Sequence, residues 1–140
     1  MQEIKLFTYD CLTIKNNLLK LLPCCKVIDE QLAFTHGQLK YDKSGYYLIK
    51  SNQNKVIFGT CYTLQIDEDD LYKLSIYSNL CNLEEIDITT INANCIDDLY
   101  KCKYEIDKHF KAYSFICNYT NLRYKRNSDV GNMSKYLLII

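Results

Sequence analysis

The sequence predicts an α+β fold in which two main helices accompany a mixed sheet that curves into a small barrel. Three observations lead to this class. About six short segments are rich in β-branched and aromatic residues, as strands are. Two other segments carry apolar residues at helical spacing. No βαβ unit repeats at regular intervals, which argues against a doubly wound parallel sheet.

The two helices have distinct start signals. Residues 14–22 place leucines on one helical stripe, with Thr13 as the expected cap and Pro23 as the expected stop. The second helix is expected to begin in the acidic run 67–70, because acidic side chains complement the positive N-terminus of a helix. Asp67 is its expected cap.

The extended segments follow from alternation and β-propensity. The strongest is Lys55 to Leu64, K-V-I-F-G-T-C-Y-T-L, in which Gly59 predicts a bulge or a close approach of another backbone. The others are residues 3–9, 27–41 with a break at His36–Gly37, 46–49, 83–91 and 110–119, while residues 99–107 fit either a strand or a short helix. Turns are expected at 43–45 and 51–54, a loop at 92–98, and a polar, basic segment at 121–133.

Length and composition indicate one domain over residues 1–140, with residues 120–140 as a C-terminal extension. The 13 Tyr and 5 Phe argue against disorder. A formal net charge of zero gives no general attraction to nucleic acid, so the basic segment 123–126 is expected to be solvated. We see no signal peptide and no apolar run of membrane-spanning length, and expect a cytoplasmic protein without a membrane partner. The apolar residues 136–140 are expected to dock as a strand or in an interface, such as that of a homodimer.

The eight cysteines form no C-x-x-C pair, and without a secretory signal they are expected to be reduced. We therefore expect no metal and no cofactor. Cys11 would act as a nucleophile only with a lowered pKa. His36 and His109 have no partner at motif spacing, so a structural role is expected for both.

Four segments, in order, resemble the gamma-glutamylcyclotransferase-like family over about residues 4–119. Each segment alone is weakly specific, and their order and spacing carry the resemblance. The segments are L-F-T-Y-D-C-L at 6–12 for L-F-x-Y-G-x-L, G-Q-L-K-Y…G-Y-Y at 37–47 for G-x-L-Y-d-x-G-x-Y-P, V-I-F-G-T-C-Y-T-L at 56–64 for V-x-G-E-L-Y-x-V, and D-L-Y-K-L-S-I-Y-S at 70–78 for L-x-x-L-D-x-Y-E.

The resemblance implies a small α+β barrel with a cavity near the end of the first strand. It also implies that the loop Tyr9, Asp10, Cys11 and Leu12 binds the carboxylate of a γ-glutamyl compound through backbone amides. A glutamate would exchange a proton with the substrate amine, which attacks its own γ-carbonyl and releases 5-oxoproline. Ring closure within one molecule is fast once the reactive conformer is held.

This chain departs from the family pattern around that site. The motif glutamate is Ser78 and the motif aspartate is Ser75, and a serine hydroxyl is not a general base near neutral pH without an activating neighbour. The turn glycine is Asp10, which brings negative charge to a loop that receives a carboxylate, and the glutamate of G-E-L-Y is Thr60. The later Y-x-R segment corresponds to residues 83–85, which hold neither Tyr nor Arg.

Asp10, Glu84 and Glu85 are the carboxylates that would have to substitute for the missing glutamate. An exposed surface position is the more common outcome for such residues. Two functions therefore stay open. The chain is a cyclotransferase with an unusual proton carrier, or it is a non-catalytic relative that binds a small ligand or a protein partner through the retained cavity.

Overall fold

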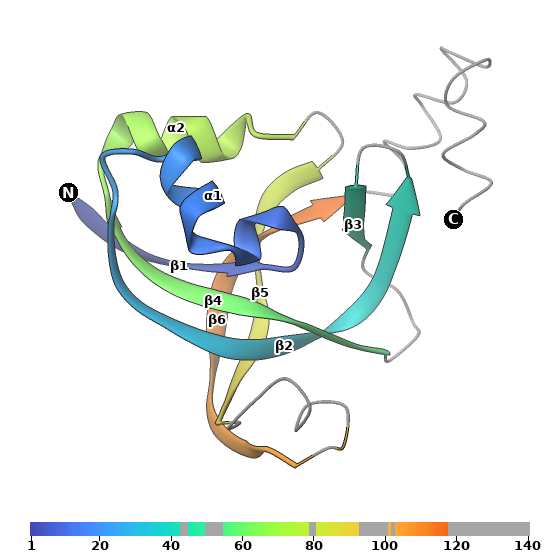
Figure 1. The fold of residues 1–140 in the computed structure, drawn as a ribbon. Coiled ribbons are helices and arrows are strands. Elements are labelled where there is room, and N and C mark those ends of the chain that lie inside the picture. Colours follow the sequence, from blue (N-terminus) through green and yellow to red (C-terminus); the bar gives the residue numbers. More distant parts are fainter. Residues whose placement is uncertain (43–44, 50–54, 79–80, 93–100, 102, 118–140) are drawn as a thin grey trace, which may run out of the picture.

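The computed structural model describes residues 1–42, 45–49, 55–78, 81–92, 101 and 103–117. Within these ranges the chain forms two α-helices and six strands, as the sequence predicted, together with one 3₁₀ helix (Figure 1). The elements are β1 (Gln2–Thr8), η1 (Cys11–Thr13), α1 (Lys15–Leu21), β2 (Lys26–Asp42), β3 (Gly45–Ile49), β4 (Lys55–Ile66), α2 (Glu68–Ser75), β5 (Cys81–Asn92) and β6 (Glu105–Cys117).

All six strands belong to one mixed sheet in the order β1-β4-β2-β3-β6-β5. Long antiparallel ladders join β1 to β4, β4 to β2, and β5 to β6. Further pairings between β1 and β6 and between β2 and β5 curl the sheet back on itself (Figure 1). The β1–β6 pairing consists of Leu6 opposite Tyr113, so the sheet is strongly curved but not a regular barrel.

The break expected at His36–Gly37 is wrong. Both residues stay in the β2–β4 ladder, opposite Val56 and Lys55, and the register shifts instead between Val27 and Asp29. A Cβ at Gly37 would lie 3.1 Å from the carbonyl oxygen of Ile49. Glycine at this position allows close packing against β3 and does not form a turn.

The close approach expected at Gly59 is confirmed. A Cβ at this position would lie 2.0 Å from the carbonyl oxygen of Thr8 and 2.9 Å from Cζ of Phe7. Only glycine lets β4 pass so near the last residues of β1. Gly59 thus fixes where β1 ends and where the following loop begins.

The larger core lies between the sheet and the helices. Leu12, Leu18 and Leu74 contribute from η1, α1 and α2, and each is at most 2% exposed. A second cluster occupies the other face of the sheet around Phe7, Ala33 and Ile88. The loop after β1 is held on the helix-bearing side because Leu12 is part of the larger core. The buried members of that core are Ile4, Leu6, Leu12, Leu18, Leu22, Cys25, Tyr47, Ile49, Tyr62, Leu64, Ile66, Leu74, Cys81, Phe115 and Cys117.

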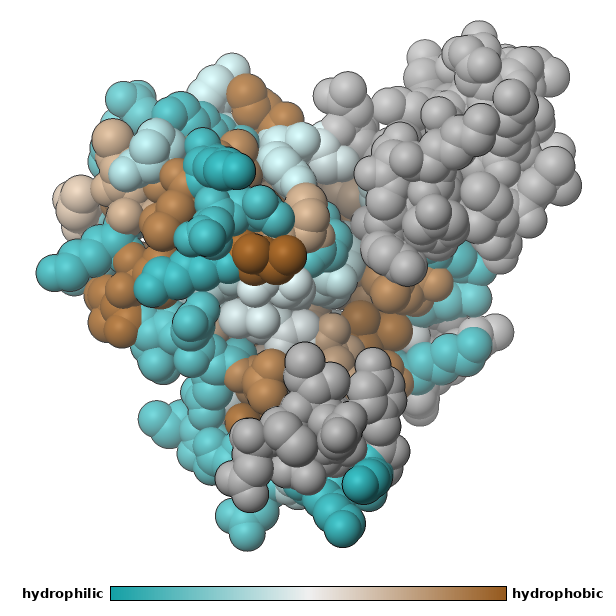
Figure 2. All heavy atoms as spheres, in the orientation of Figure 1, coloured by the Kyte–Doolittle hydropathy of each residue, from teal (hydrophilic) through white to brown (hydrophobic). Residues whose placement is uncertain are grey.

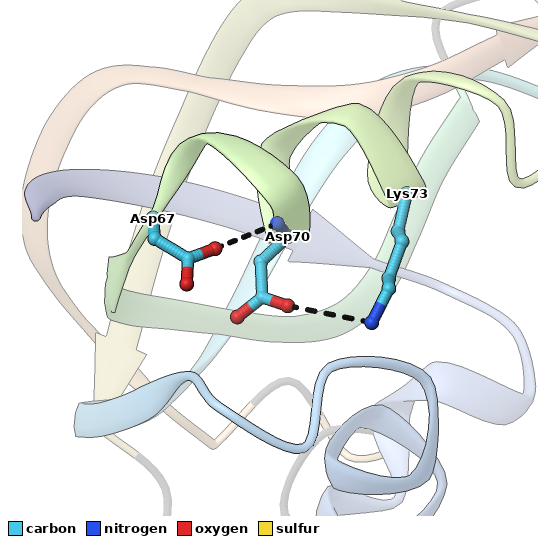
Figure 3. A network of polar contacts seen from close by, with 3 residues as sticks. All are labelled: Asp67, Asp70 and Lys73. Carbon is cyan, nitrogen blue, oxygen red and sulfur yellow. Dashed lines mark hydrogen bonds and ion pairs between the residues drawn. The ribbon is translucent and has the colours of Figure 1, made fainter.

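The helix starts differ from the prediction in one case. Asp67 caps α2 as expected, with its Oδ1 accepting the N–H of Asp70 at 2.8 Å (Figure 3). Thr13 does not cap α1: the N-cap is Ile14, without a side-chain hydrogen bond, and the Thr13 hydroxyl donates to the carbonyl of Asp10 at 2.8 Å. The 3₁₀ helix η1 precedes α1, and Asp10 caps η1 by accepting the N–H of Leu12.

Asp70 is a buried charge within α2. It is 1% exposed, and its Oδ2 has no hydrogen-bond partner among the described residues. Its Oδ1 lies 3.9 Å from Nζ of Lys73, whose side chain is half exposed (Figure 3). Burial raises the pKa of this carboxyl, with Asp67 adding to the rise and Lys73 opposing it.

Hydrophobic residues on the face shown in Figure 2 form small groups among hydrophilic ones. Single exposed apolar side chains such as Ile14 and Ile76 are common on protein surfaces. No helix in the described ranges is long and apolar enough to cross a membrane. The predictions for residues 43–44, 51–54, 93–100 and 118–140, including the basic segment and the apolar C-terminus, lie outside the described residues.

Candidate functional site

The site begins where β1 ends. Thr8 is buried and donates its hydroxyl hydrogen to the carbonyl of Thr60 at 3.0 Å. The next residue, Tyr9, is held between two distant strands. Its phenol donates to the carbonyl of Phe115 at 2.6 Å and accepts the N–H of Leu48 at 3.1 Å. Burial raises the pKa of Tyr9, so this phenol does not give up its proton near neutral pH. The two hydrogen bonds hold the ring in place, and its role is structural.

Asp10 turns the chain. Its φ of −120° is extended, so the residue that replaces the family's glycine is not strained. Its Oδ1 accepts the N–H of Leu12 at 3.1 Å, and its carbonyl accepts the N–H of Thr13 at 3.0 Å. Burial raises the pKa of Asp10, while backbone N–H groups lower it. The turn amide of Leu12 is thus already paired with a carboxylate from within the loop.

A buried tyrosine fixes the other end of the loop. Tyr62 on β4 is fully buried, and its phenol donates to the carbonyls of Leu12 at 2.9 Å and Thr13 at 2.8 Å. Burial raises the pKa of Tyr62 to about 12. Asn17 adds a hydrogen bond from Nδ2 to the carbonyl of Cys11 at 2.9 Å. The loop backbone is consequently tied to both the sheet and α1.

The end of α2 reaches the same loop. The Tyr77 phenol lies 3.5 Å from Sγ of Cys11, and its ring packs on Phe115 with a centroid separation of 5.1 Å. Ser78 is half-buried, and its hydroxyl lies close enough to Cys81, at the start of β5, to lower the pKa of that thiol. The structure therefore places the residue at the motif-glutamate position near Cys81.

These side chains form one group, which we call the loop cluster: Tyr9, Asp10, Cys11, Tyr77, Ser78 and Cys81. Electrostatic coupling links Asp10 to Tyr9, Tyr77 and Cys81. The sequence singled out four of the six members. It missed Tyr77 and Cys81, together with the supporting Tyr62. The only signal for them was position, since Tyr77 precedes Ser78 in the fourth resembling segment and Tyr62 lies in the third.

Glu84 and Glu85 lie away from the loop cluster. They pair with Ser114 and Tyr113 in the β5–β6 ladder. Glu85 is four residues beyond Cys81, about 13 Å along an extended strand, and it is exposed. Glu84 is half-buried and projects to the opposite face from Cys81, because side chains alternate along a strand. Among the three carboxylates named from the sequence, Asp10 is the one whose charge acts on Tyr77 and Cys81.

Ser75 and the two histidines considered from the sequence make contacts elsewhere in the fold. The hydroxyl of Ser75 donates to the carbonyl of Tyr72 at 2.7 Å, within its own helix. His36 packs edge-on against Phe34, and Nδ1 of His109 lies 2.8 Å from the Thr89 hydroxyl. His36 lies within β2 and His109 within β6, and the contacts just given are with residues outside the loop cluster.

A pocket of about 370 Å³ lies near the loop cluster, between β2, β3, β5 and β6. Its apolar lining includes Leu48, Ile86 and Ile116, and the Tyr9 ring packs against the cluster that these residues form. His36, Glu85, Asp87 and Lys111 contribute its polar lining. Tyr9 thus belongs to the loop cluster and also packs against apolar residues that line this pocket.

Metal binding has no support in the described part of the chain, where no three His, Cys, Asp or Glu side chains gather as ligands. The loop cluster instead combines one carboxylate, two phenols, two thiols and one hydroxyl, and none of its members is cationic. Such a set can receive a hydrogen-bond donor or a cation more readily than an anion.

Neither a family model nor a curated protein matches the chain by sequence. Solved structures do match. The Arabidopsis thaliana protein At5g39720.1 superposes with a TM-score of 0.57 at 11% identity, over 96% of this chain and 88% of that one. A protein named gamma-glutamyl cyclotransferase gives 0.53 at 10% identity, over 99% and 89%. The Arabidopsis thaliana protein At3g28950.1 gives 0.52 at 13% identity, over 99% and 83%.

The shared architecture is a curled mixed sheet with two helices on one face. This chain has the gamma-glutamyl cyclotransferase-like fold. The resemblance stated from four short segments is confirmed at the level of the fold.

Proposed function

We propose that this chain is a non-catalytic relative of the gamma-glutamyl cyclotransferases that binds a small amine-bearing ligand at the loop cluster. The observation that carries the proposal is the hydrogen bond from the Leu12 N–H to Oδ1 of Asp10, at 3.1 Å. In the family that this fold resembles, backbone amides of this loop are expected to hold the substrate carboxylate. Here the amide has a carboxylate partner from its own loop.

A substrate carboxylate would meet two obstacles at this loop. It would have to displace Asp10 from the Leu12 amide, and it would then lie beside the displaced negative charge. Like charges at contact distance repel, and burial strengthens that repulsion. The half-buried position of Asp10 thus disfavours binding of a free γ-glutamyl carboxylate.

Proton transfer is also unsupported at the motif position. The residue at that position is Ser78, and a serine hydroxyl is not a general base near neutral pH without an activating neighbour. A ligand ammonium would find a better match, because Asp10 supplies charge and Tyr77 supplies a phenol and an aromatic ring. Cation–π contact adds to such binding when the ring is partly desolvated.

A second candidate rests on a separate observation. Burial raises the pKa of Asp10, which brings this carboxyl closer to the range in which a general base works. In this version Asp10 replaces the family's glutamate and accepts the proton of the substrate amine. The chain would then retain the cyclotransferase reaction with the proton carrier moved from α2 to the loop.

One set of variants separates the two candidates. Wild type, Asp10→Asn, Asp10→Gly, Ser78→Glu and the double variant Asp10→Gly/Ser78→Glu would be compared, with Asp69→Asn as an exposed control. Release of 5-oxoproline would be measured from a panel of γ-glutamyl amino acids and amines. Binding would be measured by calorimetry with three matched ligands: an amine, its N-acetyl derivative and the corresponding free acid.

For the non-catalytic function we expect no 5-oxoproline from wild type, and tighter binding of the amine than of its N-acetyl derivative. Asp10→Asn should weaken amine binding by about tenfold or more, the cost of losing a charge-assisted hydrogen bond. Only the double variant should gain turnover. Turnover in wild type that disappears in Asp10→Asn would replace this proposal with the second candidate.

A further inference from the structure

We propose that Cys81 and Cys117 form a dithiol site that hydrogen peroxide oxidises to an intramolecular disulfide. The two cysteines lie directly opposite each other in the antiparallel β5–β6 ladder. The Cys117 thiol is also close enough to Cys81 to be the largest influence that lowers the pKa of that thiol. The proposal goes beyond ligand binding and does not depend on it, because the thiol pair is present whatever occupies the loop cluster.

The backbone geometry suits a disulfide without rearrangement. Directly opposed residues in an antiparallel ladder have Cα atoms about 4.5–5.5 Å apart. Disulfides span Cα separations of about 4.4–6.8 Å, so either kind of opposed pair falls within reach. Cys81 and Cys117 are the first residue of β5 and the last residue of β6, where a small adjustment of the strands disturbs few ladder hydrogen bonds.

The surroundings of Cys81 favour its thiolate. The pKa of Cys81 is lowered by the nearby Cys117 thiol, which is the largest cause, and by the Ser78 hydroxyl and the Tyr9 phenol. Burial and the Asp10 charge oppose this effect. Since Tyr9 already donates to the carbonyl of Phe115 at 2.6 Å, the steady donors to a Cys81 thiolate are Ser78 and Cys117.

Another buried cysteine shows the contrast. Cys61 on β4 is 4% exposed, close to the 6% of Cys81, yet burial raises the pKa of Cys61 to about 11. Similar burial thus gives opposite shifts of the thiol pKa. Polar groups near Cys81 outweigh its burial, whereas at Cys61, in the second core cluster, burial outweighs the opposing charge of Lys5. A thiolate reacts with peroxide and a thiol does not, so Cys61 is a matched internal control.

The proposed reaction has two steps. The Cys81 thiol first loses its proton to solvent, and the thiolate attacks one oxygen of hydrogen peroxide. An S–O bond forms and the O–O bond breaks. The hydroxide that leaves takes up a proton from solvent and becomes water. The Cys117 sulfur then attacks the Cys81 sulfenic acid, forming the S–S bond and breaking the S–O bond. The departing hydroxide leaves with the Cys117 proton as a second water, so two thiols lose two electrons and peroxide gains them.

The test uses the full-length, reduced protein. After a timed exposure to hydrogen peroxide, free thiols are blocked with N-ethylmaleimide and the chain is cleaved after glutamate. Cleavage at Glu84 and Glu105 puts Cys81 and Cys117 in separate peptides, apart from Cys95 and Cys102. We expect a Cys81–Cys117 peptide pair, two hydrogen atoms lighter than the sum of its parts, that disappears on reduction.

Variants sharpen the result. In Cys117→Ser the Cys81 sulfenic acid should persist long enough to be trapped by dimedone, whereas in Cys81→Ser the Cys117 thiol should stay reduced. Cys61→Ser should leave the cross-link unchanged, and Cys81 should oxidise about tenfold or more faster than Cys61 in the wild type. Thermal unfolding of each variant checks that it is folded.

Two outcomes would overturn the proposal. One is a wild-type protein in which exposed Cys11 and Cys24 are oxidised while Cys81 and Cys117 are still blocked by N-ethylmaleimide as free thiols. The other is a cross-link from Cys81 to a different cysteine. Both readings come from the wild type alone, so they hold even where a serine variant fails to fold.

Discussion

Asp10 and Asp67 each start a helical segment on the same side of the sheet. The two regions differ in whether the carboxylates that they place in the interior have hydrogen-bond partners. Asp10 begins η1 and directs its carboxylate to the Leu12 N–H, while Tyr62 binds the loop carbonyls beyond it. Asp67 begins α2 in the same manner, with a 2.8 Å bond to the Asp70 N–H. The Asp70 side chain then carries a second carboxylate into the interior, where its Oδ2 has no hydrogen-bond partner among the described residues.

The difference indicates what each region contributes. The loop after β1 is held by hydrogen bonds that satisfy its polar groups, so its shape is fixed before any ligand arrives. The α2 region is held by packing, with Leu74 fully buried, and it tolerates an electrostatic cost at Asp70. Changes to the loop supports should therefore cost stability, whereas removal of the Asp70 charge should add stability.

The largest expected effect comes from Gly59→Ala. A Cβ 2.0 Å from the Thr8 carbonyl oxygen cannot be accommodated without moving β1 or β4. We expect a loss of about 3 kcal/mol or more in the free energy of unfolding, measured by urea denaturation. Because the displaced atoms adjoin Tyr9, the loop cluster should also be disturbed.

Gly37→Ala is the matched control for that variant. Its added Cβ meets the Ile49 carbonyl oxygen and Leu48 Cδ1 at 3.1 Å each, so neighbours need to yield by only a few tenths of an ångström. We expect a loss of about 1 kcal/mol. Equal losses in the two variants would contradict the special role assigned to the approach at Gly59.

Asp70→Asn should act in the opposite direction. The substitution keeps the size of the side chain and removes a buried charge, which a 3.9 Å contact with half-exposed Lys73 compensates only weakly. We expect an increase of about 1–2 kcal/mol in the free energy of unfolding at pH 7. Asp69→Asn, on the exposed first turn of α2, should cause a small loss through the helix dipole.

The pH dependence of Asp70→Asn checks the cause. Burial raises the pKa of Asp70 above its ordinary value of 3.8, so the folded state binds a proton that the unfolded state releases. Wild type is then favoured at low pH, and it loses stability relative to the variant as the pH rises through 3.8 and the folded pKa. A gap between the two proteins that stayed constant from pH 3 to pH 7 would exclude charge burial as the reason.

The strands and helices were predictable because their signals are local. The alternating apolar residues of β5 place Ile86 and Ile88 inward and Glu85 and Asp87 outward, as expected. The errors arose where tertiary contacts decide. Gly37 suggested a break in the strand, but its position is explained by close packing against the neighbouring strand β3. Thr13 was expected to cap α1, but an additional 3₁₀ turn capped by Asp10 precedes that helix.

The site was predictable only in part, for a similar reason. The first resembling segment located Tyr9 to Leu12, and the fourth located Ser78. Cys81 belongs to no motif, and its importance depends on Cys117, which lies opposite it through a ladder that pairs residues far apart in the chain. Glu84 and Glu85 were candidates alongside Asp10 for the missing carboxylate. Both lie within the β5–β6 ladder, and β5 runs away from the loop cluster.

Tyr62→Phe is expected to have a modest effect and probes the loop most selectively. The change removes a fully buried phenol that donates to the carbonyls of Leu12 and Thr13, while the ring remains. We expect a loss of about 1 kcal/mol in the free energy of unfolding, with faster amide exchange at residues 10–13 and little change elsewhere. Exposed Tyr72→Phe is the control and should leave both measurements unchanged.

The advantage of wild type over Tyr62→Phe should itself depend on pH. Burial raises the pKa of Tyr62 from 10.0 to about 12, so the contribution of the protonated phenol is complete below pH 10 and is lost as the pH rises through about 12. A protein whose exchange rates at residues 10–13 were unaffected by the substitution would show that other contacts, such as the Asp10 cap and Asn17, are sufficient to hold the loop.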